Sequence, residues 1–107
     1  GRSEEDLLTE LMLKRGIDLS VNVEVRQFDG LTVSCVDGGK LFTCFAKQIP
    51  ASSVEELTKG IIDWHKRLKV GKDTVCYFLD DAFENNVAKT NLCAILEQHG
   101  LTNLHSL

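Results

Sequence analysis

The sequence lacks several features that mark common protein classes. No apolar run approaches the roughly 20 residues that a transmembrane helix needs. The acidic start GRSEEDLL is not followed by the apolar stretch of a secretory signal. Proline occurs once, at Pro50, so a motif with adjacent prolines is impossible. We therefore expect a cytoplasmic protein that does not enter a membrane.

Positive charge is scarce. The chain has 12 Lys and Arg against 16 Asp and Glu, for a formal net charge of −4. Nucleic-acid binding normally relies on a basic patch, because Lys and Arg displace phosphate counterions. The one basic cluster follows a predicted helix, where solvated cations complement the helix dipole and a phosphate contact is the alternative; it consists of Lys66, Arg67, Lys69 and Lys72. We expect the chain alone to bind DNA poorly.

Paired cysteines are also missing. None of the four cysteines forms a C-x-x-C pair, so zinc-site spacing is absent; they are Cys35, Cys44, Cys76 and Cys93. Three fall in apolar strand patterns and one on a predicted helix, which favours buried, reduced thiols over disulfides. A nucleophilic Cys needs an adjacent His. The sequence pairs no histidine with a particular Cys.

What the chain does contain indicates one packed domain spanning residues 1–107, since 43% of the residues are hydrophobic and 26% charged. Ser3 predicts the start of a helix and Gly16 its end, with Leu8 and Leu11 on the apolar face. Alternating residues then predict a strand over Leu19–Arg26 with one buried face.

Two turns predict an antiparallel meander of three strands. Asp29-Gly30 and Asp37-Gly38-Gly39 separate the alternating runs, and Asp-Gly is the strongest short hairpin signal. The glycines after Asp37 favour this turn over a phosphate-binding loop, because no helix follows them. Pro50 is expected to end the third strand.

The second half predicts helices alternating with strands. Ser52 and Glu55 have the spacing of a capping box, and Gly60 within this second helix suggests close backbone packing. The run DTVCYFL is continuously apolar, as in a strand covered on both faces, and a third helix and a short edge strand follow. The predicted fold is a mixed α/β sheet in the order αβββαβαβ. Its meander continues into a parallel strand–helix–strand portion, with the helices packed on the sheet.

Polar side chains follow the fourth predicted strand, where the carboxyl ends of parallel strands gather functional groups. The candidate cluster consists of Asp80, Asp81, Asn85, Lys89 and Asn91. Lys89 can reach back to Asp80 or Asp81, and Asn85 and Lys89 share one helical face. Together with Glu84, the two aspartates form either a weak cation site or, more simply, N-caps of the next helix. We favour a structural polar network over catalysis, because no nucleophile or histidine lies near in sequence.

Two segments give the chain a family resemblance. EDLLTELMLKRGIDLSV and VCYFLDDAFENNVAKTNLCAIL, in this order, resemble the C-terminal segment of modification subunits of type III restriction–modification systems. The most specific parts are Gly16-Ile17-Asp18-Leu19 and the pattern Asp80, Phe83, Lys89, Asn91. Such subunits are site-specific adenine-N6 DNA methyltransferases that use S-adenosylmethionine. The resemblance covers nearly the whole chain.

The family's catalytic and cofactor-binding residues do not carry over. Those enzymes hold the adenine with a Pro-Pro motif, which a single proline excludes, and the Phe-x-Gly form at Phe28–Gly30 lies in a hairpin. The resemblance thus implies a non-catalytic C-terminal scaffold domain, without a cofactor or metal of its own. Its partners would be the rest of the methyltransferase subunit, a second modification subunit and the restriction subunit, and it would meet DNA only through the parent protein.

Two other hypotheses remain open. The chain is alternatively a free-standing small α/β enzyme that works at Asp80–Asn91, or a homodimeric adaptor whose exposed edge strand, such as Leu19–Arg26, pairs across a two-fold axis.

Overall fold

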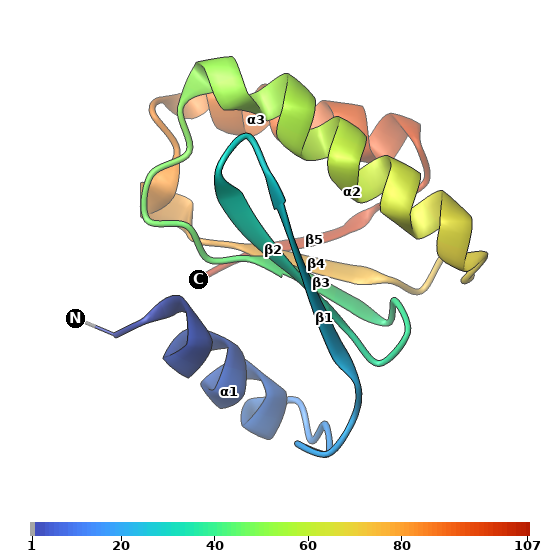
Figure 1. Ribbon diagram of the computed structural model, residues 1–107. Coiled ribbons are helices and arrows are strands. Elements are labelled where there is room, and N and C mark those ends of the chain that lie inside the picture. The colour runs from blue at the N-terminus through green and yellow to red at the C-terminus, as the bar shows by residue number, and fades with distance from the viewer. Residues whose placement is uncertain (1) are drawn as a thin grey trace.

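A five-stranded mixed sheet with three helices packed on it forms the protein, and the computed structural model describes residues 2–107 (Figure 1). The strands are β1 (Val23–Phe28), β2 (Leu31–Val36), β3 (Leu41–Cys44), β4 (Val75–Phe78) and β5 (Asn103–Ser106). The helices are α1 (Glu4–Lys14), α2 (Val54–Leu68) and α3 (Asn86–Gln98), with short 3₁₀ turns at η1 (Ala51–Ser53) and η2 (Asp80–Ala82). The predicted order αβββαβαβ is confirmed.

The strands lie in the sheet in the order of the sequence, β1-β2-β3-β4-β5. The first three pair antiparallel, whereas β3, β4 and β5 pair parallel, with α2 and α3 as the crossover helices. The predicted hairpin turns are confirmed. Asp29 and Gly30 have φ of 52° and 78°, so Phe28 lies opposite Leu31 across a two-residue turn.

The two faces of the sheet are covered unequally. Helices α2 and α3 lie together on one face, and α1 lies alone on the other (Figure 1). The larger core, under α2 and α3, includes Trp64, Phe42 and Leu92. The smaller core, under α1, includes Leu11 and Leu41. Strand β4 is therefore covered on both faces, as its continuous apolar pattern predicts, but α1 leaves the β1 end of its face open.

Helix α1 begins and ends where the sequence indicates. Ser3 Oγ accepts a hydrogen bond from the Asp6 backbone N–H at 3.0 Å, and the Asp6 carboxylate accepts from the Ser3 N–H, so a capping box closes the helix start. Gly16 has a φ of 71°, and the N–H of Ile17 donates to the Met12 carbonyl at 2.8 Å. These are the bonds of a glycine-terminated helix end. The apolar face of α1 docks on the protein's own sheet.

Gly60 lies in α2 directly against the ring of Phe28 from β1. A Cβ atom at Gly60 would overlap that ring. The close packing suggested by a glycine inside a helix is confirmed, and its partner is the residue that begins the first hairpin turn. Trp64, one helical turn further on, meets the same ring edge to face at a centroid distance of 6.2 Å.

The first strand differs from its prediction. It starts at Val23, because the segment before it folds into a turn. Asp18 holds this turn: its side chain accepts from the Ser20 N–H at 2.9 Å, and its carbonyl accepts from the Val21 N–H at 3.1 Å. The predicted buried face is also wrong in part, since Val23 packs against the core under α1 whereas Val25 stays 59% exposed.

The prediction that Pro50 ends the third strand is wrong. Strand β3 ends at Cys44, opposite the end of β4 at Phe78, well before the proline. Pro50 instead precedes the 3₁₀ turn η1, where its carbonyl accepts from the Ser53 N–H.

The capping box expected for α2 does not form either. The residue at the N-cap is Ser53, one position after Ser52, and its side chain makes no capping bond. Ser53 Oγ donates to Asp29 Oδ2 at 2.7 Å instead. A contact between α2 and the first hairpin replaces a local one.

Candidate functional site

The predicted polar cluster forms only in part: of its five residues, Asp80 and Lys89 meet, at the carboxyl ends of β4 and β5. Asp80 Oδ1 accepts hydrogen bonds from Lys89 Nζ on α3 and from Ser106 Oγ on β5, the latter at 3.4 Å. The Asp80 backbone N–H also donates to the carbonyl of Leu107 at 3.0 Å. One carboxylate thus joins a turn, a helix and the last strand. Lys89 reaches back to Asp80, as predicted.

The electrostatics of this pair favour two permanent charges. The hydrogen bond and the positive charge of Lys89 lower the pKa of the Asp80 carboxyl below its ordinary value. The hydrogen bond from Asp80 raises the pKa of the Lys89 ammonium above its own. A general acid or base works best with a pKa near the working pH, and here both pKa values move away from neutrality. The pair suits bracing better than proton transfer.

The other predicted members of the cluster make no hydrogen bond to Asp80 in the described part of the chain. Asn85 is the N-cap of α3, with its side-chain oxygen accepting from the Ala88 N–H at 2.8 Å. The expectation that carboxylates cap this helix is therefore wrong, because an amide does so. The side chain of Asn85 bonds to the backbone, and Asp81 and Asn91 are exposed.

Glu84 also points elsewhere, since its Oε1 accepts from the Ala51 N–H at 3.3 Å. Within residues 2–107, no three His, Cys, Asp or Glu side chains are placed together as a group of metal ligands. Among the described residues, Ser106 is the cluster member that sequence reasoning missed, because only the parallel pairing of β4 and β5 brings it beside Asp80.

The cysteine thiols are poorly suited to nucleophilic chemistry. All four are free, with Cys35, Cys44 and Cys76 buried and Cys93 half-buried on α3. Burial raises the pKa of the Cys35 and Cys44 thiols to about 11 and that of Cys76 to about 12. Because the thiolate is the reactive form, these residues serve the core as small apolar side chains.

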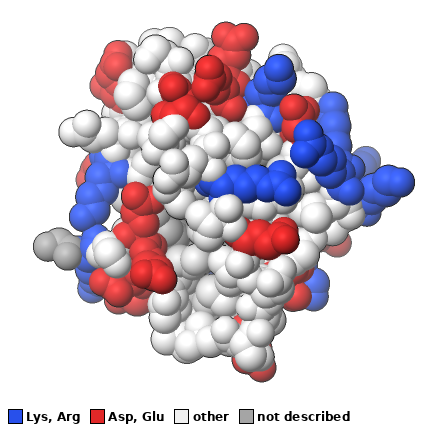
Figure 2. Space-filling view, viewed as in Figure 1, with Lys and Arg blue, Asp and Glu red and all other residues white. Residues whose placement is uncertain are grey.

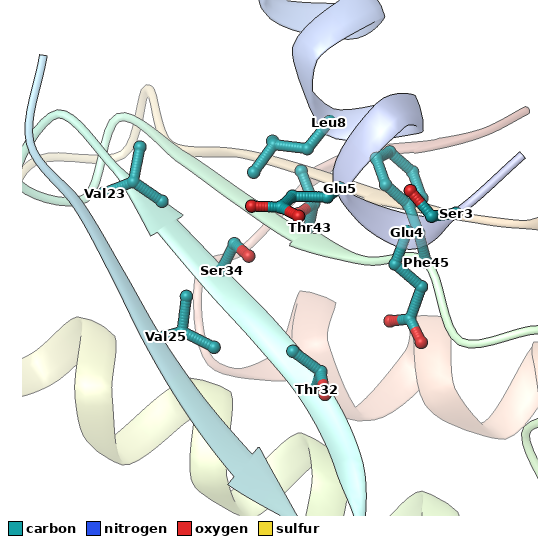
Figure 3. A pocket seen from close by; sticks show the side chains of 10 residues that line it. All are labelled: Ser3, Glu4, Glu5, Leu8, Val23, Val25, Thr32, Ser34, Thr43 and Phe45. Atoms are coloured by element: carbon teal, nitrogen blue, oxygen red, sulfur yellow. The ribbon is translucent and has the colours of Figure 1, made fainter. Parts of the chain in front are cut away.

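A groove that the sequence analysis did not single out lies beside α1, on the open part of its face (Figure 3). It encloses about 470 Å³ between the first turns of α1 and the first three strands. Glu4, Glu5 and Leu8 wall it from the helix. Strand side chains and the residue after β3 line the rest; they are Val23, Val25, Thr32, Ser34, Thr43 and Phe45. The sequence signal was the pair Thr32 and Ser34, which alternates with the buried Val33 and Cys35.

The lining of the groove combines hydroxyl, apolar and carboxylate side chains. Hydroxyl and apolar groups dominate it, and the two glutamates lie on its helix side. Activation of a Ser or Thr hydroxyl requires a base within hydrogen-bond reach. Within residues 2–107, no hydrogen bond joins Glu4 or Glu5 to a hydroxyl of the groove. The groove is thus a surface of mixed polarity next to the edge strand β1.

Charge is distributed unevenly over the molecule. The cations of the last turn of α2 gather at one end of that helix, in the part of Figure 2 where Lys and Arg side chains cluster. Acidic side chains gather around the start of α1, whose first turn contains Glu4, Glu5 and Asp6. Lys66 and Arg67 are exposed at the end of α2, where the sequence analysis places the basic cluster.

Comparisons of the chain with protein-family models, with curated proteins and with solved structures give no match. The architecture itself defines the class: a mixed α/β domain with helices on both faces of a five-stranded sheet. None of the helices in the described part of the chain is both long and apolar enough to cross a bilayer.

Proposed function

We propose that this protein is a non-catalytic scaffold and interaction domain. The observation that carries the proposal is that the central carboxylate of the predicted polar site already accepts hydrogen bonds from within the protein. Asp80 is shared by Lys89 and Ser106, so its carboxylate is engaged by the protein's own side chains. The enzymatic alternative at Asp80–Asn91 would need an acid, base or nucleophile at this edge that can reach a substrate. The raised pKa values of the three buried thiols also support a non-catalytic role.

The parent protein that we propose is the modification subunit of a type III restriction–modification system. This part of the proposal rests on the sequence resemblance of the first helix and of the Asp80–Asn91 region. In that setting the domain contacts the rest of the methyltransferase subunit, a second modification subunit or the restriction subunit. DNA and S-adenosylmethionine bind to other parts of the parent. Four free thiols are typical of a reducing compartment, which supports a cytoplasmic location.

The first experiment tests for activity of the domain itself. The chain is titrated with labelled S-adenosylmethionine and, separately, with a DNA duplex, and binding is followed by equilibrium dialysis and anisotropy. We expect no saturable binding of either at physiological salt. Saturable binding of either one would overturn the non-catalytic assignment, since the chain would then have a ligand site of its own.

A second experiment tests the parent. The gene is sequenced upstream of the first codon of this chain. An in-frame Pro-Pro methyltransferase motif would support the type III subunit. A start codon without such a motif would refute it, although the scaffold role would stand.

The enzymatic alternative at Asp80–Asn91 is tested by Lys89→Ala. Under the scaffold proposal this variant loses a little stability and, like the wild type, binds neither S-adenosylmethionine nor DNA. Loss of a measurable activity at full stability would favour the enzyme, because the substitution would then have removed a functional group rather than a brace.

A further inference from the structure

We infer that the free edge of β1 pairs antiparallel with β1 of a second copy of the chain, which makes the protein a two-fold homodimer with a continuous sheet. This inference deepens the interaction role proposed above, because it names the surface and the register at which a second copy pairs, and its test does not depend on the identity of the parent protein. It names the partner of one surface: the edge strand Val23–Phe28, which lies at the front of the molecule in Figure 1.

The hydrogen-bonding pattern of the hairpin fixes which backbone groups of β1 are free. In an antiparallel ladder, the N–H and C=O of one residue point to the same side, and successive residues alternate. The Asn22 carbonyl accepts from the Asp37 N–H at 2.8 Å, so Asn22 points toward β2. By alternation, Val23, Val25 and Gln27 point their N–H and C=O groups away from β2. Since β1 is at the edge of the sheet, these groups face outward.

The three outward residues are placed symmetrically about Val25, which is what a two-fold antiparallel pair requires. With Val25 opposite Val25 of the second copy, Val23 lies opposite Gln27 in both directions. All of these are outward-facing residues, so each pair can exchange two backbone hydrogen bonds. The strand thus offers an unbroken ladder, which is how exposed edges recruit another strand.

Charge favours the register centred on Val25 over the registers shifted by one residue. Glu24 and Arg26 stand on the same face of β1, one on each side of the central residue. In the register centred on Val25, Glu24 of each copy lies opposite Arg26 of the other, which gives two opposite-charge pairs across the strands. A shift of the centre by one residue places either two Glu24 or two Arg26 side chains opposite each other. Like charges in that position are destabilising.

Both faces of the edge strand carry features that suit this contact. On the α2 face, the Arg26 guanidinium lies over the Trp64 ring at 4.3 Å from its centroid. This stacking fixes the long side chain before association, so less side-chain entropy is lost when Glu24 of the second copy arrives. On the α1 face, Val25 is 59% exposed at the rim of the groove. Pairing covers these two valines with each other and leaves the groove accessible.

The test begins with sedimentation of the full chain over a concentration series from micromolar to millimolar. We expect a reversible monomer–dimer equilibrium. Val25→Lys puts two like charges at the centre of the interface and is expected to weaken the dimer by at least about tenfold. Val87→Lys is the matched control, because Val87 is 66% exposed and lies on α3, away from β1. It should leave the equilibrium unchanged.

Charge-reversal variants then test the register. Glu24→Arg alone places cations opposite each other, and Arg26→Glu alone places anions opposite each other, so each variant is expected to be monomeric. An equal mixture of the two restores both opposite-charge pairs and is expected to form a heterodimer. Circular dichroism checks that each variant is folded. Val25→Lys keeps the test decisive if loss of the Arg26 stacking unfolds Arg26→Glu.

Hydrogen exchange supplies the geometric readout. Amides of Val23, Val25 and Gln27 should exchange more slowly as the wild-type concentration rises, and those of Val25→Lys should not show this change. A monomer at all concentrations, or a dimer that Val25→Lys does not weaken, would overturn the inference. A dimer that neither charge variant weakens, or no heterodimer in the mixture of folded variants, would overturn the register.

Discussion

Gly60→Ala is expected to destabilise the protein although alanine favours helices. Inside a helix, Ala is about 1 kcal/mol more favourable than Gly. At Gly60 the new methyl group overlaps the Phe28 ring, and Trp64 lies against the same ring. Overpacking in a confined site costs about 1–3 kcal/mol, and we take the upper end because the ring is held by a second aromatic. The net loss is therefore about 2 kcal/mol.

Thermal and denaturant unfolding measure this loss directly. For a domain of this length, 1 kcal/mol corresponds to a shift of about 4–8 °C, so Tm should fall by about 8–16 °C. Gly71→Ala is the control: a Cβ there meets no atom within 4 Å, and Gly71 does not adopt a positive φ. Its stability should stay within about 0.5 kcal/mol of the wild type.

A double-mutant cycle identifies the contact responsible. Phe28→Leu shortens the side chain that the alanine meets, so the double variant should lose less stability than the sum of the two single variants. We expect a coupling of at least about 0.5 kcal/mol. An unchanged or raised Tm for Gly60→Ala, or strict additivity in the cycle, would refute the packing of Phe28 on Gly60.

Two further predictions concern charge and thiols. Lys89→Ala should lower stability mildly between about pH 3.8 and 10.5, the ordinary pKa values of Asp and Lys. The Asp80 pKa is lowered in the folded state, so the contribution of Asp80 to stability is lost as pH falls through this lowered pKa. The Lys89 pKa is raised, so the contribution of Lys89 is lost as pH rises through its raised pKa. The difference between variant and wild type in urea melts should thus vanish at both extremes and shrink in high salt, and a difference that persists at low pH would contradict the pair. Alkylation of the native protein, followed by mass spectrometry, should modify Cys93 first and Cys76 last, since Cys76 is fully buried with a pKa of about 12. Equal rates for the two thiols in the native state would contradict this burial.

The sequence was sufficient for the elements that depend on local signals. The turn at Gly30 and the helix end at Gly16 can be recognised from the sequence, because few residues other than glycine adopt a positive φ. Period-two and helical patterns then predicted the order αβββαβαβ. The link between Lys89 and Asp80 was also within reach, since the two residues flank a single strand-to-helix connection.

Local signals failed where a distant partner competes for the same group. Ser52 and Glu55 have capping-box spacing, but the N-cap falls on Ser53, whose hydroxyl donates to Asp29 in the first hairpin. Asp81 and Asn91 resemble members of a polar site, yet within residues 2–107 the side chain that joins Asp80 and Lys89 is that of Ser106. The sequence predicts parallel strands here, but it does not predict the register that places Ser106 beside Asp80.

The sequence by itself determined the class of fold, the hairpin turns and the buried stripes of the helices, because these follow from backbone preferences and from the period of apolar residues. Only the tertiary structure decided that α1 covers its face of the sheet unequally, which opens the groove beside Val25 and leaves the β1 edge free. The physical reason is that periodicity shows which face of a strand is apolar, whereas coverage depends on where a helix from another part of the chain comes to rest.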